Sequence, residues 1–286
     1  MQFTPTPGQT TDTVATSIEH QTLLVRVDAG VWHVTLNRPE SRNAMSLQMV
    51  RELRAVLAEA EATAGSRVLV LRGAGGHFCA GGDLKDMAAA RARLSEGTGD
   101  GGIDPIAEVN AAFGALCVAY ANTGLALVAL VEGTVMGGGF GLACVADVVV
   151  AGQSTVFRLP ETSLGVVPAQ IAPFLVERLG FSDARRLAIT GGKLDADAAL
   201  RLGLVHEVHA AGALDSALHR VLHDILHNAP GAVAATKALM ARARFHPPEA
   251  LVAEAAAVFS RAVLSAEGIE GTTAFLQKRK PGWAPA

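Results

Sequence analysis

The sequence is poor in cysteine, and its few cysteines suit neither a disulfide framework nor a metal site. The 286 residues include three cysteines, Cys79, Cys117 and Cys144, without metal-like spacing. An odd number without paired spacings is typical of a reducing compartment, so we expect a cytoplasmic protein with no bound metal. Cys79 lies in a glycine-rich turn, as either a nucleophile or a small packed residue. No histidine or asparagine partner can be assigned to it by spacing, which favours packing.

Strong net charge and uninterrupted apolar runs are also missing. A formal net charge of −3 lacks the basic excess of nucleic-acid-binding proteins, so we expect no nucleic-acid partner. The longest apolar region, residues 125–150, contains Glu132, Asp147 and several glycines, which a membrane span would not tolerate. Residues 1–19 lack the basic start and apolar block of a secretory signal, and we interpret them as a mobile tail. These absences predict a soluble protein without a membrane partner.

Hydrophobic residues, by contrast, make up 50% of the chain, which is ample for a buried core. Apolar runs typical of strands cover residues 22–27, 31–36, 67–71, 125–131, 148–151 and 155–157. Helices are predicted at residues 46–64, 88–94, 105–120, a short segment ending at 146, 174–179, 183–189, 196–202, 213–227, 232–244, 249–264 and 269–279. This alternation predicts an α/β core over residues 20–205 and a helical C-terminal part over residues 206–286. Residues 95–102 are predicted to form a flexible surface loop.

Two glycine-rich turns, at residues 77–83 and 136–141, each lie between a strand-like run and a helix-like segment. Glycines there leave backbone N–H groups bare, because no Cβ blocks the approach of a ligand. Two N–H groups that converge on one point can hold an oxyanion. The turns therefore predict chemistry on a carbonyl, without a metal or a redox cofactor. The alternative is that both turns only reverse the chain.

Several motifs in order along the chain resemble the crotonase (enoyl-CoA hydratase/isomerase) superfamily. They are Phe-Cys-Ala-Gly-Gly-Asp at 78–83, Val-Glu-Gly at 131–133, Gly-Gly-Gly at 137–139, Leu-Pro-Glu-Thr-Ser-Leu-Gly at 159–165 and Lys-Arg-Lys-Pro-Gly-Trp at 278–283. The resemblance implies a crotonase-like spiral of β-β-α units and a helical C-terminal part that mediates oligomerisation. It also implies a homotrimer or a dimer of trimers, with an acyl-CoA as the small-molecule substrate. Coenzyme A then belongs to the substrate, and no separate cofactor is expected.

The resemblance also assigns the catalytic residues. The backbone N–H groups of Ala80 and Gly138 would hold the thioester oxygen as it becomes an enolate, and fixed donors of this kind are worth about 3 kcal/mol each in barrier height. Glu161 follows Pro160 in a loop beyond a strand, where a carboxylate can reach a cleft. Taken alone, Glu161 is better interpreted as a helix-start or solvent carboxylate. Within the crotonase pattern it matches a hydratase glutamate and becomes the acid/base.

The sequence departs from the usual hydratase pattern at Gly141. A typical hydratase carries a second glutamate at this position, in the helix after the glycine triplet. Hydration with two carboxylates is therefore excluded, and Glu161 would have to act as the sole acid/base. Our hypothesis is that Gly141 leaves space for a branched or carboxylated acyl group, and that a substrate carboxylate helps to place the water.

A narrower resemblance agrees with this hypothesis. The segments at 42–46, 76–83, 138–144, 159–165 and 168–173 resemble the isohexenylglutaconyl-CoA hydratases of acyclic terpene utilisation. The methylglutaconyl-CoA hydratases of leucine breakdown are the nearest rivals, since both groups hydrate a 3-branched glutaconyl thioester. We therefore expect a hydro-lyase acting on such an enoyl-CoA. Arg158 either pairs with a substrate carboxylate or is a surface arginine, and we favour the surface.

Coenzyme A contacts are implied for two regions of the chain. The loop with Arg42 and Ala44 and the first glycine turn with Gly81, Gly82 and Asp83 resemble elements that hold pantetheine and adenine. Asp83 is also expected to accept N–H groups of its own turn. Phe275 and Lys278 resemble residues that line the acyl pocket and meet the CoA phosphates, in some relatives from a neighbouring subunit. Their alternatives are a core aromatic and a solvated lysine.

Other functions remain open on the same residues. One carboxylate suffices for a proton shuttle, so an enoyl-CoA isomerase or decarboxylase fits as well. A non-catalytic acyl-CoA-binding protein would keep the fold without turnover. His219, His223 and His227 are spaced four residues apart, as in some metal sites, but they lack acidic or cysteine partners nearby. We interpret them as a solvated or interface stripe.

Overall fold

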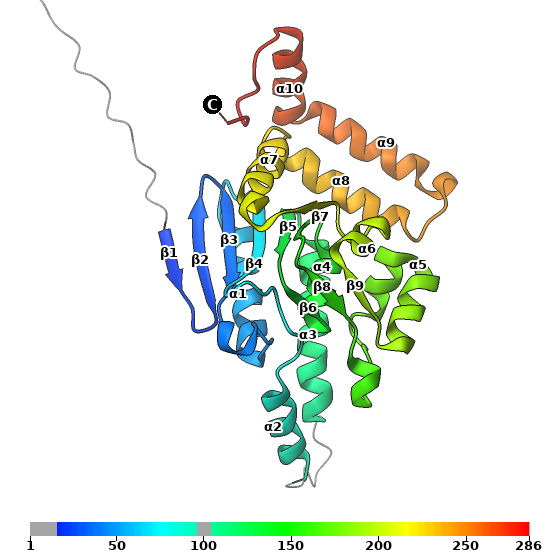
Figure 1. Ribbon diagram of the computed structural model, residues 1–286. Helices are drawn as coiled ribbons and strands as arrows, with labels where there is room; N and C mark the ends of the chain where they lie inside the picture. Colours follow the sequence, from blue (N-terminus) through cyan, green and yellow to red (C-terminus); the bar gives the residue numbers. More distant parts are fainter. Residues whose placement is uncertain (1–15, 96–103, 286) are drawn as a thin grey trace, which may run out of the picture.

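The computed structural model describes residues 16–95 and 104–285 (Figure 1). Most of the predicted tail and nearly all of the predicted loop at 95–102 lie outside these residues. The α/β class with a helical C-terminal part is confirmed. The prediction of a tail as far as residue 19 is wrong at its end, because Thr16–Glu19 forms strand β1. This strand pairs antiparallel with β2. Without this pairing, backbone N–H and C=O groups on that edge of β2 would have no partner.

The main sheet has seven strands in the order β1-β2-β3-β4-β5-β7-β10. Their bounds after β1 are β2 Leu23–Asp28, β3 Val31–Leu36, β4 Val68–Gly73, β5 Ala126–Val131, β7 Val148–Gly152 and β10 Glu207–His209. The first three strands are antiparallel, and β3 to β10 pair in parallel. Strands β2 and β3 form a hairpin, and Ala29 and Gly30 have the positive φ angles of its turn.

A second, three-stranded sheet lies next to the glycine turns. It consists of β6 Thr134–Met136, β8 Val156–Arg158 and β9 Lys193–Asp195, in the order β6-β8-β9. The sequence predicted β8 but not β6, β9 or β10. Like β8, each of these strands has only three residues, too few for alternation to be recognised, and β8 was predicted from the β-branched and aromatic residues at 155–157.

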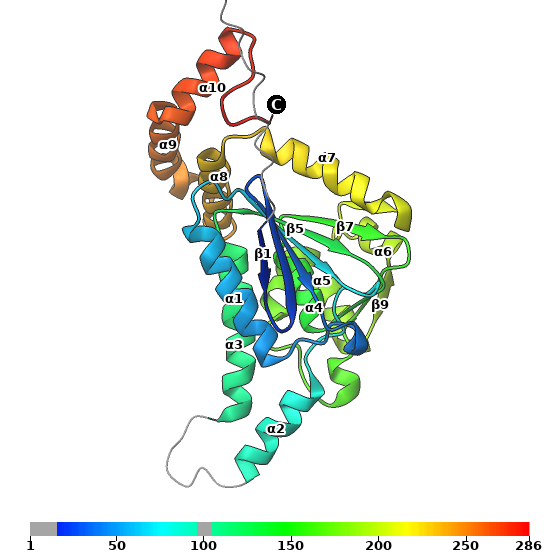
Figure 2. The same ribbon diagram turned by 90° about the vertical axis from the view of Figure 1, so that its left-hand side faces the viewer.

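The central strands of the main sheet are buried on both faces, as their continuous apolar runs require. On β4, Leu69 and Leu71 belong to the core beneath α1 Leu47–Ala62 and α3 Pro105–Asn122, whereas Val68 and Val70 face the core beneath α7 Leu214–Leu226. Figure 2 shows the two groups of helices on opposite sides of the sheet. The Ser46 hydroxyl accepts from the N–H of Met49, so Ser46 is the N-cap of α1.

The remaining helices follow the predicted order. They are α2 Leu84–Ser95, α4 Gly138–Val145, α5 Ala172–Thr190, α6 Ala196–Arg201, α8 Pro230–Ala243, α9 Pro248–Leu264 and α10 Ala266–Leu276. Helix α5 joins two predicted helices across a kink at Gly180, whose φ is +74°. Strand β10 and helix α7 lie beyond residue 205 but pack within the main sheet and its core, so the part after residue 205 is not purely helical.

Helices α8, α9 and α10 extend from one end of the molecule (Figures 1 and 2). Arg67, just before β4, links the segment after α10 to the core, because its guanidinium donates to the carbonyls of Trp283 and Asn228. The indole N–H of Trp283 in turn donates to the carbonyl of His227 at 3.1 Å. No helix among the described residues is long and apolar enough to cross a membrane.

Candidate active site

The two glycine turns, far apart in the sequence, lie against each other. Cys79 forms a β-bridge with Val135 of β6, and the N–H of Met136 donates to the carbonyl of Cys79 at 2.9 Å. A Cβ at Gly81 would lie 3.2 Å from the carbonyl oxygen of Met136 and 3.7 Å from Cα of Gly137. The turns are therefore two sides of one structure, as expected if both serve a single site.

Gly139 shows how tightly the turns are packed. A Cβ at Gly139 would lie 2.6 Å from both Cβ and O of Cys79. Such distances force the backbone to shift, so we expect Gly139→Ala to lower the free energy of unfolding by roughly 1–3 kcal/mol. Chemical denaturation measures this loss. Gly82→Ala is the matched control, because nothing lies within 4 Å of a Cβ at Gly82. Equal losses in both variants would contradict the packing described.

Gly138 supplies a backbone donor at the start of α4. It is the first residue of the helix, after the N-cap Gly137, so its N–H has no acceptor within the helix. Gly137 has φ +48° and ψ −116°, which a residue with a side chain rarely adopts. The positive end of the helix dipole adds to the attraction of an anion at this N–H. The geometry is that of an oxyanion donor.

Ala80, the second predicted donor, differs from Gly138. Its N–H donates to the carbonyl of Arg42 at 3.0 Å. Arg42 and Asn43 both have positive φ, +51° and +57°, which is costly for residues with a side chain. The Ala80 N–H is therefore engaged by a strained loop, and Gly138 provides the donor without such a partner.

Glu161 is the carboxylate of the site. It is the first residue of a 3-10 helix, Glu161–Leu164, that follows Pro160. A Cβ at Gly137 would lie 2.9 Å from its Oε1. Its Oε2 is buried and accepts no hydrogen bond from the residues that the structure describes. Burial raises the pKa of the Glu161 carboxyl above its ordinary value. A raised pKa suits a carboxyl group that takes up and releases a proton during a reaction.

The prediction of free space at Gly141 is wrong. A Cβ there would lie 2.3 Å from Cγ2 of Ile171 and 3.7 Å from Cζ of Phe113. Gly141 is buried in α4, and Ile171 is only 3% exposed. The sequence motif showed that a side chain is missing at Gly141, but only the fold shows that Ile171, thirty residues later, fills its place.

The loop that carries Arg42 and Ala44 is held by two residues that sequence reasoning did not single out. Asn43 is fully buried, and its amide donates to the carbonyls of Ala74 and His77 at 2.9 and 2.7 Å. Arg38 donates to the carbonyl of Ala44 at 2.6 Å and pairs with Asp83 at 2.8 Å.

Asp83 accepts the N–H of Lys85 at 2.9 Å, which confirms the expected bond within its own turn. Although burial alone would raise the pKa of the Asp83 carboxyl, hydrogen bonds from Lys85 and Arg38 hold it below its ordinary value. Asp83 is therefore ionised and fixes the loop to the first glycine turn.

Phe275 and Lys278 are not brought to Glu161 within this chain. Both views place α10 at the end of the molecule remote from α4 (Figures 1 and 2). The alternative of Phe275 as a core aromatic is wrong, because its side chain is 84% exposed. Contact with a substrate would require the site of another subunit.

The other candidates have structural explanations. Cys79 is fully buried, and burial raises the pKa of its thiol to about 12, so it is a packed residue and not a nucleophile. Arg158 is exposed, in agreement with a surface arginine. The rings of His223 and His227 stack at 4.0 Å. Across residues 16–95 and 104–285, no three His, Cys, Asp or Glu side chains form a group that could hold a metal.

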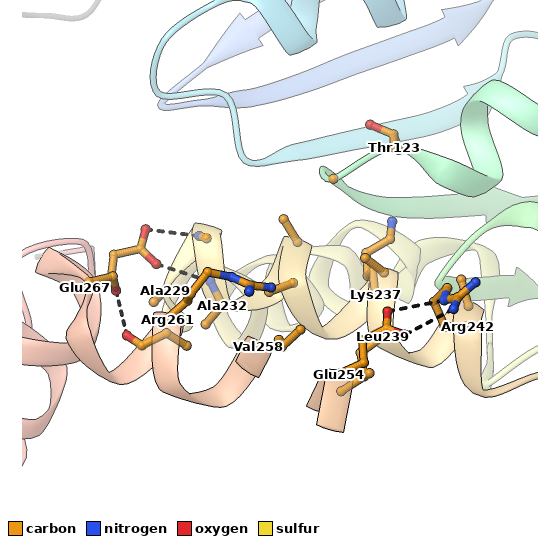
Figure 3. A pocket seen from close by; sticks show the side chains of 18 of the residues that line it. Thr123, Ala229, Ala232, Lys237, Leu239, Arg242, Glu254, Val258, Arg261 and Glu267 are labelled. Carbon is orange, nitrogen blue, oxygen red and sulfur yellow. Dashed lines mark hydrogen bonds and ion pairs between the residues drawn. The ribbon is translucent and has the colours of Figure 1, made fainter. Parts of the chain in front are cut away.

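A cavity of about 1450 Å³ lies elsewhere, between the end of α3 and helices α8 to α10 (Figure 3). Neither glycine turn nor Glu161 lines it. Three of its cations form ion pairs, Arg242 with Glu254 at 3.1 Å, Lys237 with Asp147 at 2.5 Å, and Arg244 with Glu177. The backbone donor of Gly138 and the buried carboxylate of Glu161 therefore lie outside this cavity.

The sequence model of the enoyl-CoA hydratase/isomerase family matches residues 26–285. The solved structure of Pseudomonas aeruginosa AtuE has a TM-score of 0.87 and 54% identity, covering 93% of this chain and 100% of that one. An enoyl-CoA hydratase/isomerase from Marinobacter aquaeolei has a TM-score of 0.88 and 48% identity, with the same coverage. A probable enoyl-CoA hydratase of Rhodobacter capsulatus is 32% identical, covering 92% of this chain and 98% of its own length.

Proposed function

Since the chain belongs to the enoyl-CoA hydratase/isomerase family, we propose that it adds water to a 3-branched glutaconyl-type enoyl-CoA, with isohexenylglutaconyl-CoA as the favoured substrate. One observation carries the reaction type. The carboxylate of Glu161 has a buried, unpaired oxygen and lies against Gly137, next to the free N–H of Gly138. An acid/base and an oxyanion donor side by side are what hydration of an enoyl thioester needs.

The reaction uses Glu161 twice. Its carboxylate takes a proton from water while the oxygen adds to Cβ of the substrate, and the π electrons move to the thioester oxygen. The N–H of Gly138 donates a hydrogen bond to this oxygen as its negative charge develops. The carbonyl then forms again as protonated Glu161 returns its proton to Cα. One water is added, and Glu161 ends ionised as it began.

Ala80 takes part in this scheme only after a change of partner. Its N–H becomes a second donor to the thioester oxygen once the carbonyl of Arg42 releases it. Because Arg42 is in a strained conformation, a small movement of its loop suffices for the exchange.

The substrate class rests on sequence resemblance and on the wall of the site. The segments that resemble isohexenylglutaconyl-CoA hydratases include residues 168–173, which carry Ile171. The hydrocarbon of Ile171 and Phe113 next to Gly138 and Gly141 suits an apolar branch on the acyl group. The alternative substrate is 3-methylglutaconyl-CoA, whose branch at C3 is a smaller group.

Isomerisation is a second candidate, because the single carboxylate of Glu161 can also move a proton between two carbons of an acyl-CoA. The family includes isomerases as well as hydratases. Isomerisation leaves the mass of the substrate unchanged, and decarboxylation lowers it by one carbon dioxide.

An assay that distinguishes these reactions uses purified protein with isohexenylglutaconyl-CoA, 3-methylglutaconyl-CoA or crotonyl-CoA. We expect loss of the conjugated thioester absorbance and a product heavier by one water, with the highest kcat/KM for isohexenylglutaconyl-CoA. A product of unchanged mass would show that the reaction is an isomerisation and not a hydration. Binding of all three thioesters without turnover would show an acyl-CoA-binding protein.

We also propose that the protein assembles as a homotrimer or a dimer of trimers. The exposed Phe275 on α10 and the nearby Lys278 would then reach the acyl-CoA in the site of a neighbouring subunit. Exposed apolar side chains on α8 to α10, among them Met240, Phe259 and Leu264, agree with an oligomer interface.

A further inference from the structure

Ile171 lies against α4 one helical turn beyond the position that Glu161 faces. Gly141 lies four residues after Gly137, and its N–H donates to the Gly137 carbonyl at 3.0 Å. A Cβ at Gly137 would approach Glu161, and a Cβ at Gly141 would approach Ile171, to 2.3 Å from its Cγ2. Glu161 and Ile171 thus lie along successive turns of α4.

The position of Ile171 is fixed by its surroundings. Ile171 is the N-cap of α5, and its carbonyl accepts the N–H of Leu175 at 2.9 Å. Its neighbour Gln170 lies over Gly114 of α3, where a Cβ would be 2.0 Å from Oε1 of Gln170. The Gln170 amide also donates to Asn110 at 2.8 Å. Because its side chain is β-branched and 3% exposed, Ile171 has little freedom to turn away.

Phe113 continues the same hydrocarbon surface towards the oxyanion donor. Its Cζ would lie 3.2 Å from a Cβ at Gly138 and 3.7 Å from a Cβ at Gly141. The side of α4 between these two glycines is therefore covered by Phe113 and Ile171. Neither side chain can hold a water molecule or exchange a proton.

We propose that Ile171 is a specificity-determining residue that occupies the place of a second acid/base group and so confines proton transfer to Glu161. This inference rests on the proposed hydratase function. With hydrocarbon at Gly141, the water is held by Glu161 and by the polar group of the substrate itself. Acyl-CoAs that carry a carboxyl group near the double bond satisfy this requirement, and straight-chain enoyl thioesters do not. Ile171 thereby leaves straight-chain enoyl thioesters without a second group to hold the water.

A stability cycle tests the packing without any assay of activity. Gly141→Ala is expected to lower Tm by roughly 4 °C or more in the wild-type protein, because its Cβ meets Ile171. In the Ile171→Ala background the same change is expected to have little effect. Equal shifts in both backgrounds would overturn the proposal, since Ile171 would not be what fills the place.

A gain of function tests the chemistry. Gly141→Glu combined with Ile171→Ala is expected to hydrate crotonyl-CoA at least about tenfold faster in kcat/KM than Ile171→Ala alone. The matched control is Gly141→Gln with Ile171→Ala, which has the same size but no carboxylate and should gain nothing. An equal gain from Gly141→Glu alone, or from the Gln control, would overturn the proposal.

These results are distinguishable from a failure of the proposed function. Wild-type turnover of 3-methylglutaconyl-CoA and isohexenylglutaconyl-CoA tests that function directly. If neither is hydrated, the proposed function fails, and the stability cycle still decides whether Ile171 occupies the position at Gly141. If the double variant does not fold, the stability cycle of Gly141→Ala in the two backgrounds tests the proposal instead.

Discussion

Replacement of Glu161 by Gln is expected to lower kcat about 10³-fold for the preferred enoyl-CoA. The amide keeps the size of the side chain but can neither accept the proton from water nor return one to Cα. The other carboxylate at the glycine turns in the described contacts is Asp83, which is held in an ion pair with Arg38, so we expect no second group to take over. Steady-state kinetics with circular dichroism of the folded variant measures the loss.

A charge-matched control separates this effect from a general one. Glu59 is exposed on α1, so Glu59→Gln removes a carboxylate of the same kind outside the site and should leave kcat unchanged. If Glu161→Gln retained a tenth or more of the wild-type kcat, the assignment of Glu161 as sole acid/base would be wrong.

The pH profile gives an independent readout of the same residue. Glu161 must be ionised to take a proton from water, and burial raises the pKa of its carboxyl above the ordinary 4.5. Activity is therefore present above the raised pKa and lost as the pH falls through it, at a pH higher than an exposed glutamate would give. In Glu161→Gln this acid limb should be absent from the residual kcat/KM.

Removal of the Gly138 N–H is expected to lower kcat by about 10²–10³-fold, or roughly 3–4 kcal/mol of barrier. Proline achieves this removal because it lacks the N–H and is well tolerated at the first position of a helix, which Gly138 occupies in α4. Gly137 has a positive φ outside the helical region, so it does not conflict with a following proline. The measurement is kcat for Gly138→Pro relative to Gly138→Ala.

Alanine at Gly138 is the matched control because it also adds a Cβ. That Cβ lies 3.2 Å from Cζ of Phe113 in both variants, so the displacement of the ring cancels in the comparison. Proline differs from alanine by the lost N–H and by the ring atoms Cγ and Cδ, so KM is measured beside kcat to separate a steric effect on binding from the lost hydrogen bond. Equal kcat values for the proline and alanine variants would show that the thioester oxygen is held elsewhere, with Ala80 as the first residue to test.

Most of the fold follows from local sequence patterns. Valine- and leucine-rich runs such as Val68–Gly73 and Ala126–Val131 form buried parallel strands because they can be covered on both faces. Ser46 begins α1 because its hydroxyl satisfies an N–H that the helix leaves free. By contrast, β6, β9 and β10 are strands only because a neighbouring strand, β8 or β7, offers them backbone partners, which no three-residue pattern reveals.

For the site residues, too, some facts follow from the sequence and others only from the fold. The glycine motifs and the Pro160-Glu161 step identify, by their order along the chain, which residues form the site. They do not show that the Ala80 N–H is bound to Arg42 or that Phe275 is exposed at the remote end of the chain. Both facts depend on contacts between segments that are far apart in the sequence.

The sequence by itself determined the α/β class, the two glycine turns and the absence of a side chain at Gly141, because each depends on the properties of a few adjacent residues. Only the tertiary structure decided what stands in place of that side chain. Close packing brings Ile171 from the start of α5 to within van der Waals contact of α4, so a position that is empty in the sequence is filled in the folded protein.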